Sequence, residues 1–346
     1  MTSTPDRMKA LLARVASGET LGVAEARAAF EIMMSGDATP AQVGGFLMGL
    51  RVRGETVDEL VGGAQVLRER MVKVQAPEHA IDTCGTGGDG SGTLNVSTGA
   101  ALVVTACGVP VAKHGNRALS SRAGSADVLT ALGVNIDADL ALVERAIRGV
   151  GIGFMMAPRH HGAMRHVAGA RIELGTRTIF NLLGPLANPA GARRQIVGVF
   201  ARQWVEPVAH VLGQLGAERA WVVHGADGLD ELSTTGPSYV AELRDGTVRT
   251  FEVSPEDAGL NCARKDDLRG GDATTNADAL RALLDGVRGP YRDIVAFNAA
   301  AALIVAGQVD DLEAGVARAL EAIDSGAAKD VLRGLVAISN EALPRE

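Results

Sequence analysis

A glycine-rich segment between an expected strand and an expected helix has the composition of an anion-binding turn. Residues 82–98 read DTCGTGGDGSGTLNVST, with five glycines and several hydroxyl side chains. Glycines let backbone N–H groups approach phosphate oxygens, and a helix that begins near Ser97 adds free N–H groups and the positive end of its dipole. The segment therefore predicts that the chain binds a phosphate-bearing ligand.

Two common nucleotide-binding fingerprints do not fit this turn. Gly85, Gly87 and Gly90 have dinucleotide spacing, but the acidic residue expected about 20 positions further on is missing, because Asp127 is the next one after Asp89. A Walker loop also fails, since no Lys-Ser or Lys-Thr pair follows the glycines. A purely structural turn remains the alternative to anion binding.

A second cluster of anion-binding residue types follows the next expected strand, residues 109–112. It contains two cations and two hydroxyl donors, namely Lys113, Arg117, Ser120 and Ser121. Ser125 is placed to cap a helix that runs to Leu132. Two anion sites at neighbouring strand ends suit a substrate with two separated phosphate groups.

An adjacent pair of carboxylates follows a further expected strand, residues 220–223. Asp230 and Glu231 are hard oxygen ligands of the kind that Mg²⁺ prefers. Such a pair is also common in solvated loops, so by itself it leaves both interpretations open. Three nearby histidines have neither the spacing of a helical zinc motif nor a cysteine partner, which favours a packing or lining role; they are His160, His161 and His166.

The elements that must position these residues fall into two groups. Residues 1–73 show helical spacing of apolar side chains, and capping boxes at Thr39 and Thr56 mark two helix starts. From about residue 78, short β-type runs alternate with helical segments, which is typical of a mostly parallel sheet covered by helices, and residues 240–253 predict one added hairpin. We therefore predict an α/β fold with a helical domain, 1–73, completed by about 158–187, and an α/β domain, 74–157 and 188–346.

Bulk composition restricts the class of protein. A chain of 346 residues predicts two domains rather than one. A net charge of −7 and an aromatic content of 3% argue against a nucleic-acid binder. The apolar stretches are too short to span a membrane, and three widely spaced cysteines give neither a disulfide framework nor a paired-cysteine zinc site. These features favour a cytoplasmic protein without a membrane partner.

Four long segments, in this order along the chain, resemble anthranilate phosphoribosyltransferases. They are residues 82–98, residues 113–121, Arg171 with residues 177–185, and residues 224–233. The resemblance covers nearly the whole chain and implies the fold shared with pyrimidine nucleoside phosphorylases, together with a homodimer formed through the helical domain. It implies transfer of the 5-phosphoribosyl group from phosphoribosyl pyrophosphate to the amine of anthranilate, giving N-(5-phosphoribosyl)anthranilate and pyrophosphate, in tryptophan biosynthesis.

The same resemblance implies roles for individual positions. Phosphoribosyl pyrophosphate is expected to contact Gly85, Gly88, Asp89, Thr93, Asn95, Val96, Ser97, Thr98, Lys113, His114, Gly115, Asn116, Arg117, Ala118, Leu119, Ser120, Ser121 and Ser125. Magnesium, at two ions per monomer, is expected on Ser97, Asp230 and Glu231, and anthranilate on Gly85, Asn116 and Arg171. Catalysis is expected to depend on Lys113, Asp230 and Glu231.

One departure from the family pattern lies beside the expected anthranilate channel. Gly162 and Arg165 stand where the family more often has Pro and Lys. Two rival functions share the architecture, a nucleoside phosphorylase and a non-catalytic relative that binds nucleic acid. Arg171 with the Asn116-Arg117 pair favours anthranilate over a nucleoside, and the acidic chain with its carboxylate pair disfavours nucleic acid.

Overall fold

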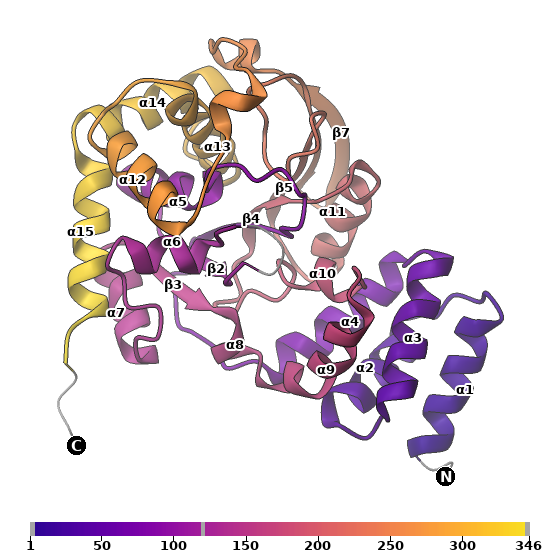
Figure 1. Ribbon diagram of the computed structural model, residues 1–346. Helices are drawn as coiled ribbons and strands as arrows, with labels where there is room; N and C mark the ends of the chain where they lie inside the picture. Colours follow the sequence, from indigo (N-terminus) through magenta and orange to yellow (C-terminus); the bar gives the residue numbers. More distant parts are fainter. Residues whose placement is uncertain (1–3, 119–121, 343–346) are drawn as a thin grey trace.

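A sheet of seven strands forms the centre of the molecule, and helices cover both of its faces (Figure 1). The structure is a computed structural model that describes residues 4–118 and 122–342. The strand order is β3-β2-β1-β4-β5-β6-β7. The strands are β1 (Ile81–Gly85), β2 (Val111–Gly115), β3 (Ile152–Met156), β4 (Arg194–Gly198), β5 (Arg219–Gly225), β6 (Ser238–Arg244) and β7 (Thr247–Val253). The first five are parallel, and β6 and β7 are the antiparallel hairpin that the sequence predicts.

Both faces of the sheet are buried because apolar side chains alternate between two cores. Ile196 packs with the helices of one face, and its neighbour Val197 packs with those of the other. The first face carries α5 (Val96–Ala106), α6 (Ser125–Ala131), α12 (Ala273–Leu284), α13 (Pro290–Val305), α14 (Leu312–Asp324) and α15 (Ala327–Ser339). Helix α11 (Val205–Gln214) packs on β5 and β6, and α7 (Leu140–Gly149) packs on β3.

A bundle of helices lies to one side of the sheet, at the lower right of Figure 1. It consists of α1 (Thr4–Ala16), α2 (Val23–Ser35), α3 (Pro40–Arg53) and α4 (Val57–Arg70), joined by the later α8 (Ala157–His160), α9 (Arg165–Leu174) and α10 (Phe180–Leu183). Helix α9 contacts α2 and α3, and the rings of Phe30 and Phe180 meet edge to face at 5.5 Å. The segment after β3 therefore packs against the bundle.

The helix starts of the bundle follow the expected capping chemistry. The Gln42 N–H donates to Thr39 Oγ1, and the Thr39 N–H donates to Gln42 Oε1. Thr56 and Glu59 repeat the arrangement at α4. These reciprocal bonds satisfy N–H groups that have no partner within the helix.

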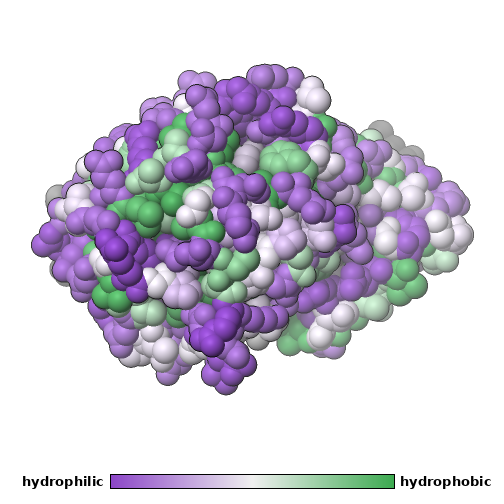
Figure 2. Space-filling view, turned by 90° about the horizontal axis from the view of Figure 1, so that it is seen from above, coloured by the Kyte–Doolittle hydropathy of each residue, from purple (hydrophilic) through white to green (hydrophobic). Residues whose placement is uncertain are grey.

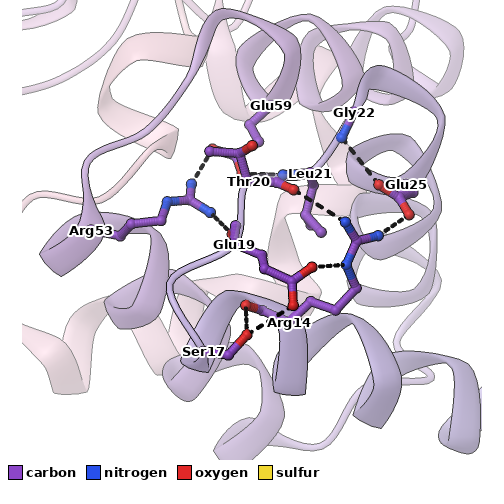
Figure 3. Close-up of polar contacts among 9 residues, drawn as sticks. All are labelled: Arg14, Ser17, Glu19, Thr20, Leu21, Gly22, Glu25, Arg53 and Glu59. Atoms are coloured by element: carbon purple, nitrogen blue, oxygen red, sulfur yellow. Dashed lines mark hydrogen bonds and ion pairs between the residues drawn. The ribbon is translucent and has the colours of Figure 1, made fainter.

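Glu59 also ties the α1–α2 connection to the α3–α4 connection (Figure 3). Its side chain is fully buried, Oε1 accepts from the Leu21 N–H at 3.0 Å, and Oε2 accepts from the Thr56 N–H at 2.9 Å. The Arg53 guanidinium forms an ion pair with the same Oε2. The buried charge thus has an opposite charge and two backbone donors.

The outer surface is mostly hydrophilic in the view from above, with hydrophobic patches between the polar side chains (Figure 2). None of the described helices has the length and apolar character needed to cross a lipid bilayer.

Candidate functional site

A cleft of about 620 Å³ opens at the carboxyl ends of β1 and β2. From β1 the chain builds the sheet outward through β2 and β3, and then returns to add β4 on the other side of β1. Ligands of open α/β sheets bind at such a reversal, because the connections on the two sides separate there. The wall of the cleft includes Asp89, Lys113 and Glu231, so three residues predicted to act together lie in one pocket.

The glycine-rich turn forms one wall of this cleft. Gly87, Gly88, Gly90 and Gly92 have positive φ values of 64°, 71°, 74° and 62°, which residues other than glycine rarely adopt. Gly85 is needed for a different reason, since a Cβ there would lie 2.4 Å from Asp230 Oδ2. The turn therefore presents backbone rather than side chains to a ligand.

The first turn of helix α5 lies at the cleft, next to the glycine-rich turn. The helix begins at Val96, close to the predicted start at Ser97. The Ser97 N–H donates to Glu231 Oε1 at 3.1 Å, and the Ser97 hydroxyl lies 3.5 Å from Lys113 Nζ. The positive end of the helix dipole thus faces a carboxylate in the structure and favours any anion in the cleft.

The loop that carries Asp230 and Glu231 is fixed from both sides. Asp227 Oδ2 accepts hydrogen bonds from Ser233 Oγ at 2.8 Å and from Thr235 Oγ1 at 2.7 Å. The Asn298 side chain accepts from the Leu232 N–H and donates to the Leu232 carbonyl, both at 2.9 Å. The two carboxylates are therefore held in place before any ligand binds.

The carboxylates of Asp230 and Glu231 are short of partners. Among the described residues, Asp230 accepts one hydrogen bond from another residue, the Gly87 N–H at 2.7 Å, and Glu231 accepts one, from Ser97. Desolvation by the surrounding protein raises the pKa of both carboxyls well above the ordinary range; the charge of Asp89 raises the pKa of Asp230 further, and the charges of Asp230 and Asp89 raise that of Glu231 further. A hard divalent cation would supply the positive charge that balances the two carboxylates.

Lys113 lies inside β2 rather than beyond its end, because the strand begins later than the sequence pattern suggests. The side chain is 2% exposed, and Nζ donates to the Thr83 carbonyl oxygen at 2.6 Å. Its positive charge lowers the pKa of Asp230 and of Glu231, although less than burial raises them. Lys113 is thus a fixed charge in the floor of the cleft.

The second predicted anion-binding segment is only partly as expected. Arg117 Nη1 forms an ion pair with Asp127 Oδ1 at 3.1 Å. Ser125 is not the helix cap, because α6 begins at Ser125 itself and Gly124 is the N-cap, while the Ser125 hydroxyl donates to the Asn116 carbonyl and Asp127 Oδ2 accepts from the Gly124 N–H at 2.9 Å. The carboxylate at the third helical position thus reaches back to the backbone of the N-cap residue, as in a capping box.

Most of the predicted site residues line the same cleft. These are Gly85, Gly88, Asp89, Thr93, Asn95, Val96, Ser97, Lys113, His114, Gly115, Asn116, Arg117, Ala118, Ser125, Arg171, Asp230 and Glu231. Thr98 is not part of the wall, since it is 1% exposed within α5. Leu119, Ser120 and Ser121 fall outside the described residues.

The far end of the cleft combines an arginine with apolar and imidazole groups. The Arg171 guanidinium lies 5.2 Å from the centre of the Phe180 ring, and no described carboxylate comes within ion-pair distance of it. Burial lowers the pKa of Arg171. His114 and His161 lie side by side with their Nε2 atoms 3.3 Å apart. An unpaired cation in an apolar setting is suited to an aromatic carboxylate.

Gly198 is a site residue that sequence reasoning missed. A Cβ on Gly198 would lie 1.5 Å from the Asp230 carbonyl oxygen, so only glycine allows the carboxylate-bearing loop to approach β4 this closely. The register pairs Gly198 with Gly85, and both glycines therefore make room for Asp230. Two glycines at the ends of adjacent strands were the only signal in the sequence.

A distant segment also holds the glycine-rich turn, and sequence reasoning gave it no role. Thr93 forms a β-bridge with Arg269, and a Cβ on Gly270 would lie 2.6 Å from the Thr93 carbonyl oxygen. Asn276 Nδ2 donates to Asn95 Oδ1 at 2.8 Å. The glycine-rich turn is thus positioned by residues that lie far from it in the sequence.

Comparisons with known proteins agree with this geometry. Residues 77–329 match the α/β domain of the glycosyl transferase family, and residues 9–71 match its helical bundle domain. The anthranilate phosphoribosyltransferase of Rhodospirillum rubrum is 67% identical over 336 residues, which cover 97% of each chain. The crystal structure of anthranilate phosphoribosyltransferase from Thermus thermophilus has a TM-score of 0.91 and 44% identity, and the match covers 96% of this chain and 99% of that one. The enzyme from Saccharomyces cerevisiae in complex with PRPP and Mg has a TM-score of 0.87 and 27% identity, with 96% and 97% covered.

Proposed function

The chain belongs to the anthranilate phosphoribosyltransferases of the glycosyl transferase family, and from this premise we propose how its cleft binds the substrates. The enzyme transfers the 5-phosphoribosyl group from phosphoribosyl pyrophosphate to the amine of anthranilate, with release of pyrophosphate, in tryptophan biosynthesis. One observation carries the proposal: backbone donors, the start of α5, Lys113 and the Asp230–Glu231 pair all line one cleft.

Phosphoribosyl pyrophosphate is assigned to the part of the cleft between the glycine-rich turn and the start of α5. The N–H groups of this wall suit its phosphate oxygens. Gly115 supports the same assignment for residues 113–121. A Cβ at Gly115 would lie 2.4 Å from Ser125 Oγ, so only glycine lets the end of β2 and Ser125 lie this close together. Arg117 is assigned to the same substrate, which would then compete with Asp127 for its guanidinium.

Mg²⁺ is assigned to Asp230, Glu231 and Ser97, at two ions per monomer. The residues fit the ion, since two half-buried carboxylates with one donor each need a compensating charge and offer hard oxygen ligands. When bound, Mg²⁺ supplies positive charge beside the oxygens of pyrophosphate. The relative from yeast was solved with PRPP and Mg, which supports the use of this metal.

The chain itself stabilises the departure of pyrophosphate by electrostatics that are in place beforehand. Displacement at the ribose C1 builds negative charge on the leaving oxygens. The N–H groups of the glycine-rich turn and of α5 hold those oxygens, and the buried Lys113 adds a fixed positive charge nearby. The amine of anthranilate is neutral at pH 7, so its attack requires orientation more than activation.

Arg171 and Asn116 are assigned to anthranilate, with Gly85 lining the point where the two substrates meet. The guanidinium matches a carboxylate with two parallel donors, which would direct the amine toward C1. We expect Arg171→Ala to raise the KM for anthranilate by about ten- to a hundredfold and to leave the KM for phosphoribosyl pyrophosphate nearly unchanged. Equal losses for both substrates would remove Arg171 from this role.

The direct test of the proposal is the loss of anthranilate fluorescence when phosphoribosyl pyrophosphate and Mg²⁺ are added. We expect turnover to require all three components. Phosphate-dependent cleavage of thymidine without use of anthranilate would instead identify a nucleoside phosphorylase.

Three further features are proposed with the function. The helical domain comprises residues 1–73 and about 158–187, which is supported by the shared core of Phe30, Val167 and Phe180. A homodimer forms through this domain, where Val52 and Ile172 are 82% and 79% exposed on the contacting helices α3 and α9. The three free cysteines support a cytoplasmic location. Light scattering of the purified protein tests the dimer, and Val52→Glu with Ile172→Glu should yield monomers.

A further inference from the structure

Three potential metal ligands lie together on the face of the sheet opposite Lys113. Because Ile81 pairs with Val111 in register, Cys84 lies beside His114 on the next strand, and Asp82 lies on the same face two residues earlier. One ligand atom from each of these side chains lies within 4.8 Å of the other two. Lys113 and His114 are successive residues of β2, so their side chains point to opposite faces.

One imidazole nitrogen in this cluster lacks a proper partner. His114 is 3% exposed, and its Nδ1 makes no hydrogen bond of normal geometry among the described residues. The backbone of Gly184 lies close enough to raise the pKa of the imidazole, although burial lowers that pKa more. Its Nε2 is occupied by His161. Buried polar atoms normally have a well-formed hydrogen bond, so an imidazole whose Nδ1 has only the Gly184 backbone near it, beside a thiol and a carboxylate, points to a missing ligand.

We propose that Asp82, Cys84 and His114 form a binding site for a borderline-soft divalent cation such as Zn²⁺, separate from the carboxylates assigned to Mg²⁺. Thiolate, imidazole and carboxylate are the ligand types of zinc, and three protein ligands leave the fourth position open. One thiolate and one carboxylate balance the two charges of the ion, which reduces the cost of burying it. Mg²⁺ does not compete well here, because it prefers oxygen ligands.

The site can be reached from the cleft, and occupation of it inhibits the transferase. Cys84 and His114 both line the cleft, next to Gly85 and Asn116. Asp82 is anchored behind them, with Oδ2 accepting from Asn188 Nδ2 at 2.7 Å and Oδ1 accepting from the His114 N–H at 3.1 Å. An ion on His114 and Cys84 would intrude on the space assigned to anthranilate. Inhibition by Zn²⁺ should therefore persist when Mg²⁺ is raised.

The test is calorimetric titration of Zn²⁺ into the full-length protein, stripped with EDTA and returned to millimolar Mg²⁺. We expect one Zn²⁺ per chain, and Cys84→Ser should weaken the affinity at least about a hundredfold, since even outer-shell partners contribute about ten- to a hundredfold. Cys262→Ser is the matched control, because Cys262 is exposed and lies outside the cluster, and its affinity should equal that of the wild type. Titration with Co²⁺ should produce a thiolate-to-metal absorption band in the wild type that is absent from Cys84→Ser.

Three results would overturn the proposal. Equal Zn²⁺ affinity in the wild type and in Cys84→Ser would show that the thiol is not a ligand. Loss of Zn²⁺ binding in Asp230→Asn with Glu231→Gln, but not in Cys84→Ser, would place the ion on the other carboxylates. Thermal melting of each variant establishes that it is folded, and the Co²⁺ thiolate band should persist in Cys262→Ser but not in Cys84→Ser; its loss in Cys262→Ser would place the ion on the exposed thiol.

Discussion

The helical bundle and the edge of the sheet both carry carboxylates shielded from water, but the bundle buries Glu59 fully, whereas Asp230 and Glu231 are half-buried at the cleft. Glu59 in the bundle is matched by Arg53 and by two backbone donors. Asp230 and Glu231 at the sheet edge have one donor each among the described residues, and no arginine. A carboxylate whose hydrogen-bond donors and opposite charge are all present stabilises the fold. A carboxylate that lacks them is available to bind a cation. Burial alone therefore does not mark a functional site, and the deficit of partners does.

The largest effect is expected when the sheet-edge carboxylates are neutralised. Asp230→Asn with Glu231→Gln should lower kcat about a thousandfold, because the Mg²⁺ that we propose to lie beside the leaving group loses its anchors. The free energy of unfolding without Mg²⁺ should be unchanged or higher, since two repelling buried charges are removed. Steady-state kinetics and urea unfolding measure the two quantities. A clear loss of stability would mean that this pair is structural, as Glu59 is.

The reverse outcome is expected at Glu59. Glu59→Ala leaves Arg53 unpaired and two backbone N–H groups without an acceptor, so the free energy of unfolding should fall by about 3–5 kcal/mol. The kcat of the folded protein, measured well below its melting temperature, should remain close to that of the wild type. Urea unfolding measures the loss, and Glu59→Gln, which keeps an oxygen acceptor, should lose less. A selective loss of kcat would break the contrast between the two regions.

A smaller but more specific effect is expected at Gly198, which seats the Asp230 carbonyl. Gly198→Ala should force the loop away from β4 and lower kcat by about a hundredfold, because displacements near 1 Å can cost that much. Gly44→Ala is the control, since nothing lies within 4 Å of a Cβ at this position in α3. The control should keep its kcat and gain about 0.5–1 kcal/mol in stability. Equal kcat in both variants would contradict the close approach.

The smallest effect is a slope of stability with pH in EDTA. The pKa values of Asp230 and Glu231 are raised in the folded protein, so their contribution to stability is present below their unfolded pKa values and is lost as pH rises through the raised ones. The melting temperature of the wild type should therefore fall more between about pH 5 and about pH 8 than that of the Asp230→Asn, Glu231→Gln variant. Saturating Mg²⁺ should reverse the difference. If the melting temperatures of the wild type and the variant changed in parallel with pH in EDTA, the pKa values of these carboxyls would not be raised in the folded protein.

The helices and strands, and the clustering of polar residues at strand ends, can be predicted from the sequence because both depend on local signals. Capping boxes at Thr39 and Thr56, the alternation of strands and helices, and polar residues at strand ends are all read within a few positions. Parallel strands bring their carboxyl ends to one edge, which is why Asp89, Lys113 and Glu231 can be predicted to converge.

The rest depends on tertiary contacts that no local pattern encodes. The sequence predicts a free cation at Arg117, but Asp127 folds back to pair with it. It also predicts that Ser125 caps its helix, but the helix begins one residue earlier, with Gly124 as the N-cap and Asp127 bound to the Gly124 N–H. Asn276 contacts Asn95 from far along the chain, and only the assembled fold brings the two together.

The β-bridge between Thr93 and Arg269 has a consequence for how the enzyme is made. During synthesis the first three parallel strands emerge long before Arg269, so the substrate loop leaves the ribosome without the strand-like segment that completes it. Contacts this distant along a chain form late, because ordering the intervening loop must come first. The glycine-rich turn of a nascent chain can therefore reach its final position only once residues 269–276 have been translated and packed.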